Sequence, residues 1–262
     1  MIKVTRIGHA CVLLDLDGTR ILTDPWFSEK TGYHPGEGPG VRLSDLPPLD
    51  AVVASHGHYD HYDMAAFSAY PDHSLPVFVK SGTAATARAA GFHDVTELDW
   101  WNEASVGGVN ITAAPAKHAV PENTYVFQCE SGVVFFAADT VLIPELDEVG
   151  RRFPQIDVLL VSTNGLRLKP LLNRKVVMDA EDAAELCVRL KPRAVIPMHY
   201  AFESRHWFHD LFLISYTRGP EAFVDACARR SVDAAVRVSA PGEEVSIPPA
   251  EQPRRDRSWA PA

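Results

Sequence analysis

Three histidines and one aspartate fall within six positions of the sequence, in the stretch SHGHYDH at 55–61. They directly follow the apolar run AVVA, which is typical of a strand that is buried on both faces. His56 and His58 alternate along one side of an extended turn, whereas Asp60 and His61 come from the next bend. Neutral imidazole is the commonest protein ligand for borderline divalent metals, and carboxylate complements it. We therefore expect this loop to supply ligands to two metal ions; the alternative is a polar loop whose histidines are simply solvated.

A ligand-type residue also stands past the end of each of three other predicted strands. His118 comes soon after the apolar stretch VNITAA, Asp139 follows VVFFAA, and His199 follows AVIPM. Enzymes built on sheets place their chemistry beyond the carboxyl ends of strands. The repeated context indicates that these residues share one site with the loop at 55–61.

The pattern His-x-His-x-Asp-His resembles the signature of the metallo-β-lactamase fold hydrolases. The segments GHAC at 8–11 and TDP at 23–25 resemble the opening of the branch that includes ascorbate-6-phosphate lactonase and N-acylphosphatidylethanolamine phospholipase D. The resemblance covers nearly the whole chain and implies a four-layer α/β/β/α sandwich. The periodicity of the sequence alone predicts only an α/β or α+β fold.

The resemblance also implies a ligand set, carried over one residue at a time. His118 matches the third histidine of the first metal site, and His199 matches the last histidine of the second. Asp139 matches the aspartate that bridges both metals, although the chain has Ala-Asp-Thr where the family has Gly-Asp-Thr. The first site then contains His56, His58 and His118, and the second contains Asp60, His61 and His199, with Asp139 shared.

Two adjacent divalent metal ions would explain hydrolysis without a serine or cysteine nucleophile. Coordination lowers the pKa of bound water from about 15.7 toward 7, so a metal-bridging hydroxide forms at neutral pH, and the partner ion polarises the electrophile. Asp60 is expected to orient the hydroxide or pass on its proton, with His61 and Asp139 completing the catalytic set. We expect zinc, with manganese or iron as alternatives, because His and Asp ligands tolerate all three. The sequence thus predicts a dinuclear hydrolase that cleaves a phosphodiester, lactone or ester bond in a small molecule.

Two other functions remain open from the sequence. Iron-dependent oxidation occurs on the same fold, but its flavodiiron members place a glutamate where His58 stands and carry a flavin domain for which 262 residues are too few. A non-catalytic protein that binds metal or another ligand would keep the ligand residues without the chemistry. The sequence has no Gly-x-Ser-x-Gly motif and no P-loop, so serine-hydrolase and nucleotide-kinase functions lack support.

Three residues are candidates for contact with a substrate. His9 is placed to reach the metals from beneath, although a structural histidine fits equally well. Asn164 follows a buried run, where either a substrate contact or a plain turn is expected. Trp207 lies in the aromatic segment 201–216, which forms either an apolar pocket or part of the core. Asp24 is expected to support a ligand histidine rather than to bind metal itself.

The remaining elements must hold these residues at one edge of the fold. An Asp-Gly turn at 17–18 joins the strands of a hairpin, and a long Gly/Pro-rich loop covers 27–48. Ser81 is expected to cap a helix that Gly91 ends. Strand candidates are 2–7, 10–16, 20–23, 51–54, 76–80, 95–98, 108–114, 125–130, 133–138, 156–162, 194–198, 235–238 and 244–247, and helix candidates are 63–70, 81–90, 178–190 and 220–230.

The composition bounds the fold and the partners. With 46% hydrophobic residues and no break in composition, the chain is predicted to form one domain over 1–247 and a flexible tail over 248–262. Its formal net charge of −9 disfavours a nucleic-acid partner. The four cysteines are far apart, so buried free thiols are expected. No apolar run is long enough to span a membrane, and the N-terminus lacks a signal-peptide core. We therefore expect a cytoplasmic protein without stable membrane insertion, which acts on a small molecule and can form homo-oligomers.

Overall fold

The first of two seven-stranded sheets contains the N-terminal hairpin and the strand before the histidine-rich loop. The computed structural model describes residues 1–28, 33–34 and 36–250. Pairing is antiparallel from β19 to β3 and parallel from β3 to β7. In order across the sheet, the strands are β19 (Glu244–Ile247), β1 (Ile2–Gly8), β2 (Cys11–Leu16), β3 (Thr19–Thr23), β5 (Ala51–Ala54), β6 (Val77–Lys80) and β7 (Val95–Leu98).

The second sheet has the same design and carries the remaining predicted ligands. Its strands are parallel from β18 to β11 and antiparallel from β11 to β8. In order across the sheet, they are β18 (Ala235–Val236), β15 (Ala194–Met198), β12 (Val158–Ser162), β11 (Gly132–Phe136), β10 (Thr124–Cys129), β9 (Val109–Ala114) and β8 (Glu103–Val106).

Side chains alternate between the centre of the sandwich and its outer layers. In β12, Val158 and Leu160 pack between the two sheets. Leu159 and Val161 of the same strand pack on the opposite face, in the cluster that includes the helices. Because both faces are buried, such strands are continuous apolar runs in the sequence rather than alternating patterns.

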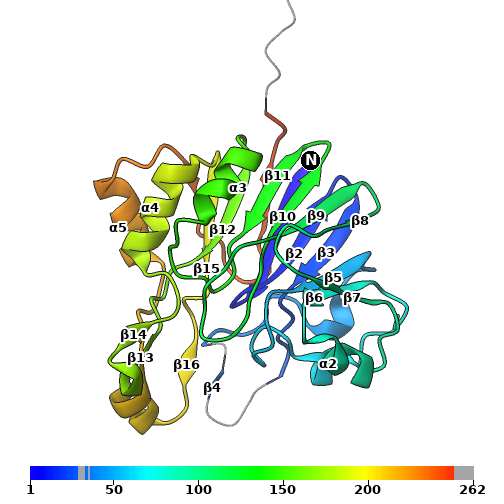
Figure 1. Ribbon diagram of the computed structural model, residues 1–262, viewed down its shortest axis with the longest axis horizontal. Coiled ribbons are helices and arrows are strands. Elements are labelled where there is room, and N and C mark those ends of the chain that lie inside the picture. The colour runs from blue at the N-terminus through cyan, green and yellow to red at the C-terminus, as the bar shows by residue number, and fades with distance from the viewer. Residues whose placement is uncertain (29–32, 35, 251–262) are drawn as a thin grey trace, which may run out of the picture.

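Helices cover the outer face of each sheet (Figure 1). The second sheet shares an apolar cluster with α3 (Leu146–Arg152), α4 (Ala180–Leu190) and α5 (Glu221–Arg229), and the first sheet shares one with α1 (Met64–Phe67) and α2 (Ala84–Ala89). This order of helix, sheet, sheet and helix confirms the predicted four-layer sandwich. Among the described residues, no helix has the length and apolar character needed to cross a membrane.

We expect Leu160→Ala to lower the free energy of unfolding by about 2–5 kcal/mol. Leu160 is fully buried between the sheets, so its truncation leaves a cavity that paired strands on both sides cannot close. Urea denaturation measures the change. Val188→Ala, on the exposed face of α4, is the control and should change the unfolding free energy by less than about 0.5 kcal/mol. A loss at Leu160 as small as the control's would mean that the centre of the sandwich can repack.

A small lobe stands apart from the two sheets, at the lower left of Figure 1. The aromatic segment 201–216 lies in this lobe as short strands and a π-helical turn. The long loop at 27–48 contributes one short strand to the lobe, and its turn η1 (Leu43–Asp45) lies outside the lobe. The lobe contains β13 (Arg167–Leu168), β14 (Arg174–Lys175), β17 (Ile214–Ser215), β4 (Tyr33–His34), β16 (Glu203–Ser204), η2 (Lys169–Leu171) and η3 (His209–Leu213).

The start of α2 differs from the predicted one. The residue at the N-cap position is Thr83 rather than Ser81, and its side chain makes no capping hydrogen bond. Instead, Glu97 of β7 accepts hydrogen bonds at 3.0 Å from the backbone N–H groups of Gly82 and Ala84. A neighbouring strand therefore supplies the acceptor that the local sequence pattern assigned to Ser81, and the prediction for Ser81 was wrong.

β8, α3 and the short strands and turns of the lobe are not among the elements predicted from the sequence. β8 is a strand of four residues none of which is buried, and the seven residues of α3 include only two buried ones, Leu146 and Val149. The single domain over 1–247 stays a prediction, although all the strands and helices described above fall within it. The predicted flexible tail at 248–262 lies, from residue 251 onward, outside the described residues.

Candidate metal centre

The predicted ligands follow strand ends at one edge of the sandwich. Three of the strands that precede them, β5, β11 and β15, run parallel to a neighbouring strand. The fourth, β9, is antiparallel to β10, which is antiparallel to β11, so β9 and β11 run in the same direction and their carboxyl ends lie at the same edge. Residues that are far apart in the sequence therefore meet at this edge. The loop after β5 in the first sheet carries His56, and the loops after β9, β11 and β15 in the second sheet carry His118, Asp139 and His199.

Four residues around this edge have a left-handed backbone although none of them is glycine. They are His9 (φ 54°), Asp24 (φ 41°), Ala138 (φ 46°) and His199 (φ 60°). A residue other than glycine costs about 1–2 kcal/mol in this region, so the surrounding strands must hold it there. Ala138 stands where the family resembled by the sequence has glycine, and its positive φ gives the physical reason for that preference.

Three histidine nitrogens converge on one point beside the loop after β5. His56 Nε2 and His58 Nδ1 are 2.8 Å apart, and His118 Nε2 is 3.3 Å from His58 Nδ1. Ligands of a tetrahedral zinc ion, with bonds of about 2.0–2.1 Å, lie about 3.3 Å from one another. The second ring nitrogen of His118 is engaged elsewhere, 2.7 Å from the carbonyl oxygen of Val176. The three converging atoms therefore suit one metal ion.

Burial keeps these three imidazoles neutral. Desolvation lowers the pKa of His58 and of His118, and it holds the pKa of His56 well below its ordinary value. A neutral imidazole offers a free lone pair to a metal ion, whereas an imidazolium does not. The protonation state of the group thus matches the geometry.

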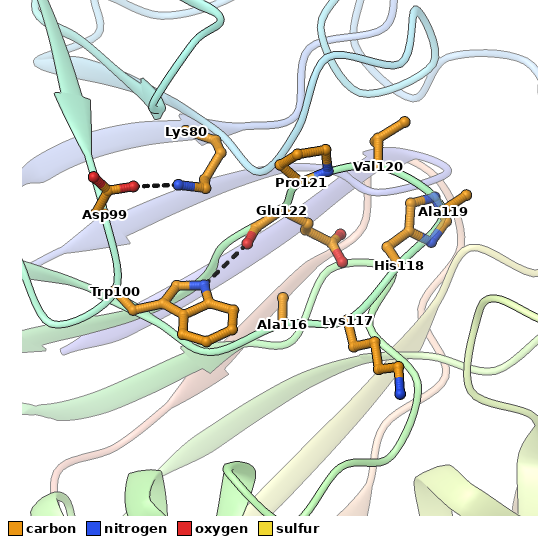
Figure 2. Close-up of a pocket in the computed structure, with 10 residues that line it drawn as sticks. All are labelled: Lys80, Asp99, Trp100, Ala116, Lys117, His118, Ala119, Val120, Pro121 and Glu122. Carbon is orange, nitrogen blue, oxygen red and sulfur yellow. Dashed lines mark hydrogen bonds and ion pairs between the residues drawn. The ribbon is translucent and has the colours of Figure 1, made fainter.

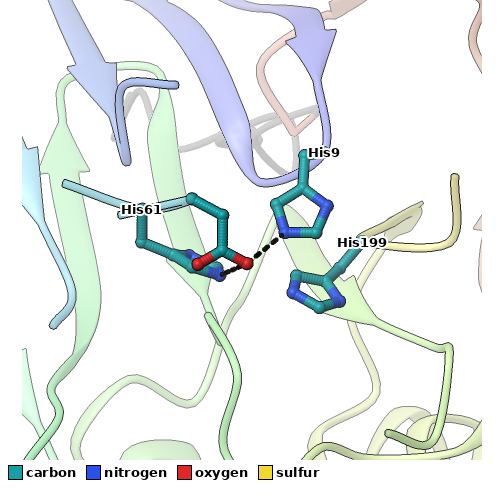
Figure 3. A group of neighbouring side chains, drawn as sticks. His9, His61 and His199 are labelled. Carbon is teal, nitrogen blue, oxygen red and sulfur yellow. Dashed lines mark ion pairs between the residues drawn. The ribbon is translucent and has the colours of Figure 1, made fainter. Parts of the chain in front are cut away.

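A second group of ligand-type side chains lies beside the first. It comprises His9, Asp60, His61 and His199, and Figure 3 shows the three rings turned toward one another. Asp60 Oδ2 lies 3.3 Å from His9 Nε2 and 3.9 Å from His61 Nε2. Asp139 Oδ2 lies 3.2 Å from His61 Nε2 and 2.9 Å from His199 Nε2. Two carboxylates therefore face the imidazole nitrogens of this group.

Both carboxylates are ionised at neutral pH. Burial raises the pKa of Asp139, but the adjacent His199 and His61 outweigh burial and hold it well below its usual value. The pKa of Asp60 is lowered in the same way, against burial, by His61 and His9. Conversely, burial lowers the pKa of His61, but Asp139 and Asp60 outweigh it and raise that pKa well above its usual value. The second group is thus a concentrated pair of negative charges with imidazoles around it.

The donor atoms in both groups fit divalent metal ions. Within the described residues, neither ring nitrogen of His9 or His199, nor Nε2 of His61, forms a hydrogen bond of regular geometry, although the three Nε2 atoms lie 2.9–3.3 Å from oxygens of Asp60 and Asp139. Leaving a buried polar group unsatisfied costs about 1–3 kcal/mol, and a metal ion bound between these nitrogens and oxygens would satisfy both. Imidazole and carboxylate together are the donors that zinc, manganese and iron accept in proteins.

Asp24 supports the second group from behind. Its Oδ2 accepts hydrogen bonds from His61 Nδ1 at 2.7 Å and from Ser55 Oγ at 2.6 Å, and its Oδ1 accepts one from Ser55 N at 2.7 Å. The hydrogen bond from Nδ1 fixes the His61 ring with Nε2 toward the metal group. Asp24 therefore occupies the supporting position that the sequence analysis expects.

Glu122 is a buried part of the site that the sequence pattern does not single out. Its Oε1 accepts a hydrogen bond from Asp139 N at 2.8 Å and lies 3.3 Å from His56 Nδ1. Burial, reinforced by the charge of Asp139, raises the pKa of Glu122 well above its usual value. The residue thus connects a histidine of the first group to the aspartate of the second. Its only signal in the sequence is its place shortly after His118 in the same loop.

The three candidate substrate residues lie in different surroundings. His9 belongs to the second ligand group. Asn164 is fully buried, and its side-chain nitrogen has no hydrogen-bond partner among the described residues. Trp207 is 75% exposed on the lobe and belongs to neither ligand group. Phe202, from the same aromatic segment, is instead buried with its ring centre 5.7 Å from that of His9 and 6.3 Å from that of His199.

A pocket of about 590 Å³ opens beside His118 (Figure 2). Trp100 lines it, and the indole N–H donates a hydrogen bond at 3.2 Å to the backbone oxygen of Glu122, which fixes the ring. Lys117 lines this pocket and also a neighbouring one of about 480 Å³, which His118 borders as well. An aromatic ring and a cation thus flank the first ligand group.

Known sequences resemble the chain over most of its length. Residues 19–200, more than half of the chain, match the profile of the β-lactamase superfamily domain. An uncharacterized protein of Mycobacterium tuberculosis is 31% identical over 61% of the chain, and the chain spans about half of that relative, 48% of its length. A metal-dependent hydrolase of Caldivirga maquilingensis is 24% identical over 92% of the chain and 96% of its own length.

One further relative is similar in sequence over a shorter segment of the chain, and one solved structure is similar in fold. The N-acyl-phosphatidylethanolamine-hydrolyzing phospholipase D 1 of Caenorhabditis elegans is 34% identical over 44% of the chain and 37% of its own length. The crystal structure of an isothiocyanate hydrolase from Delia radicum gut bacteria superposes with a TM-score of 0.77 and covers 94% of the chain and 99% of its own. Its sequence identity of 20% makes this a likeness of fold alone.

Proposed function

The chain belongs to the β-lactamase superfamily, and from this premise we propose that it is a metal-dependent hydrolase. It is proposed to bind two divalent metal ions and to cleave a phosphodiester, lactone or ester bond in a small molecule. The position of Asp139 carries this proposal. The carboxylate of Asp139 lies against His61 and His199. The backbone N–H of Asp139 donates a hydrogen bond to Glu122 Oε1, and the same oxygen lies next to His56 Nδ1. One residue thus connects two sets of metal-type donors.

The chain's own residues would prepare the site for hydrolysis. When bound, two divalent metal ions would acidify water and stabilise the negative charge that develops on the scissile group. Asp60 is ionised and its side chain is slightly exposed, so it can orient a water molecule or accept its proton. His61 is held by Asp24 with Nε2 toward the site, so the ligand does not have to reorganise when metal binds.

The surroundings of the first ligand group favour a substrate with an apolar part and a negative charge. Trp100 offers a fixed aromatic face, and Lys117 offers a cation between two pockets. The name of the Caenorhabditis elegans relative describes hydrolysis of an acylated phospholipid, which supports the phosphodiester among the three bond types. The metal is proposed to be zinc, with manganese or iron as alternatives of the same donor chemistry.

Metal analysis paired with turnover tests the proposal. We expect close to two metal ions per chain, hydrolysis of bis(p-nitrophenyl) phosphate or of a simple lactone, and loss of both metal and turnover after chelation. His58→Ala should lose most of the metal, whereas His73→Ala should keep it, because His73 packs against Phe92 and bonds to Ser68 O. The ratio of the two activities ranks the bond types.

The same experiment separates the two competing functions. A reconstituted protein that holds iron and consumes oxygen without hydrolysing either compound would favour the iron-dependent oxidoreductase. A folded protein that takes up no metal and turns over neither compound would favour the non-catalytic binding protein. Either result would overturn the proposed hydrolysis.

A further inference from the structure

Seven large apolar side chains are exposed on the lobe. They are more than half of the twelve large apolar side chains that are exposed in the described part of the chain: Leu171, Leu172, Trp207, Phe208, Leu211, Phe212 and Leu213. We call this surface the apolar tip. Its two segments are joined, since Lys169 Nζ donates hydrogen bonds to the backbone oxygens of Asp210 and Leu211. Contiguous exposed apolar surface of this kind marks a site of interaction.

The backbone at the end of the lobe holds a leucine out in solvent. Leu172 is 98% exposed, and its φ of 55° lies in the left-handed region, as does the φ of 57° at Asn173. The turn is closed by a hydrogen bond at 3.2 Å from Asn173 N to Lys169 O. A turn that holds an exposed leucine in the left-handed region is unfavourable for a surface that meets only water. The conformation makes sense if Leu172 leaves water when a partner binds.

The tip is surrounded by cations although the chain as a whole is acidic. The segments 166–175 and 204–218 contain six cations and one acid, Asp210, whereas the whole chain has a formal net charge of −9. Among these cations, Arg167, Lys175 and Arg218 pair with carboxylates of Asp179, Asp182 and Glu203 next to the lobe. Even when these three acids are counted, cations outnumber acids by six to four. The lobe therefore attracts an anionic partner. The cations are Arg167, Lys169, Arg174, Lys175, Arg205 and Arg218.

The shape and charge of the tip favour a lipid surface over a second copy of the chain. In Figure 1 the lobe projects away from the two sheets, so its end can meet a flat, deformable surface. Exposed Trp, Phe and Leu beside Lys and Arg form the usual pattern of proteins that rest in the interface of an anionic bilayer. A symmetric dimer through the same tip would instead bring two basic lobes together.

We propose that the apolar tip docks the protein reversibly on anionic lipid membranes, with Leu172 and Trp207 entering the interface and the surrounding cations contacting lipid headgroups. This is a peripheral contact, and it involves no membrane-spanning segment. The tip is attached to the wall of the metal centre, because Ile214 packs with Phe202 and Trp26 in one apolar cluster. Docking would therefore hold the metal centre close to the membrane. The inference does not depend on the reaction proposed above.

Co-sedimentation with vesicles tests the docking. The full chain is mixed with phosphatidylcholine vesicles that contain no anionic lipid or about 30% phosphatidylglycerol. We expect sedimentation with the anionic vesicles, and weaker binding when salt is raised from about 0.1 M to about 0.5 M. The double variant with Leu172→Ser and Trp207→Ser should bind at least about tenfold more weakly, because it loses two apolar side chains from the interface.

Controls separate docking from misfolding and from dimerisation. Val188→Ser, an exposed apolar residue on α4, should bind vesicles like the unaltered protein. The double variant should keep the melting temperature of the unaltered protein, because both side chains are in solvent; the two single variants replace it if it does not fold. Sedimentation that is absent with anionic vesicles, or equal in the tip variants, would overturn the proposal. So would a dimer in solution that the tip variants dissociate, since a second copy would then cover the tip.

Discussion

Asp139→Asn should remove most of the bound metal and lower hydrolytic turnover by more than about 100-fold. Loss of residues that merely support metal ligands already costs about 10–100-fold in affinity or activity, and Asp139 lies directly against two ligand nitrogens. Asparagine has nearly the same shape but carries no charge. Its amide would leave His61 and His199 without the carboxylate that now lies 3.2 Å and 2.9 Å from their Nε2 atoms. Elemental analysis and turnover on the same sample measure both losses.

Asp157→Asn is the matched control for this variant. Asp157 is also a buried aspartate and lies at the opposite end of β12 from Ser162, whose hydroxyl donates a hydrogen bond to Asp139. It pairs with Arg193 and accepts a hydrogen bond from Val133 N, away from the ligand groups. The control should keep its metal content and turnover even if it is less stable. Equal metal content in the two variants would contradict the role given to Asp139.

Asp24→Asn should weaken metal binding by about 10–100-fold. Asp24 is not itself a candidate metal ligand, but it contacts Nδ1 of His61, the ring nitrogen that points away from the metal group. The carboxylate of Asp24 accepts hydrogen bonds from His61 Nδ1 and from both the backbone and the hydroxyl of Ser55. An asparagine amide has only one oxygen, so its NH₂ group must face a donor. The loss of a satisfied partner should also lower the free energy of unfolding by about 1–3 kcal/mol. Metal titration and urea denaturation measure the two effects separately.

Ser55→Ala provides a graded comparison for Asp24. It removes one hydroxyl donor but leaves the contact between Asp24 and His61 and the backbone donor of residue 55 in place. We expect a smaller loss of metal affinity than in Asp24→Asn. The Ser55 hydroxyl also lies 2.9 Å from Nδ1 of His56. If Ser55→Ala lost as much metal affinity as Asp24→Asn, the loss would come from the support of His56 rather than from the orientation of His61.

The sequence alone predicts the candidate ligand residues, and its resemblance to a known family predicts the fold that carries them. Runs such as 51–54 and 158–162 are almost continuously apolar, which is a local property of the sequence and is typical of strands that are buried on both faces. The polar residue that follows such a run stands at the strand's end wherever the strand packs. His56 and Asp139 could therefore be placed at the edge of a sheet before any tertiary contact was known.

Contacts between distant segments were decided only by the tertiary structure. Glu97 replaces Ser81 at the start of α2 because β7 packs against that helix, and no local pattern encodes this. Glu122 reaches His56 and Asp139 because three loops from two sheets converge.

In the aromatic segment 201–216, residue type likewise fails to predict which side chains are buried. Phe202 is buried beside the metal centre, and Trp207 stands in solvent on the lobe. Both are large apolar residues, so their types could not distinguish them; the fold of the lobe turns one toward the sandwich and the other away from it. Residue type and spacing determined which atoms can bind metal, and the packing of the two sheets decided which side chains support and surround them, because burial depends on segments that are remote in the sequence.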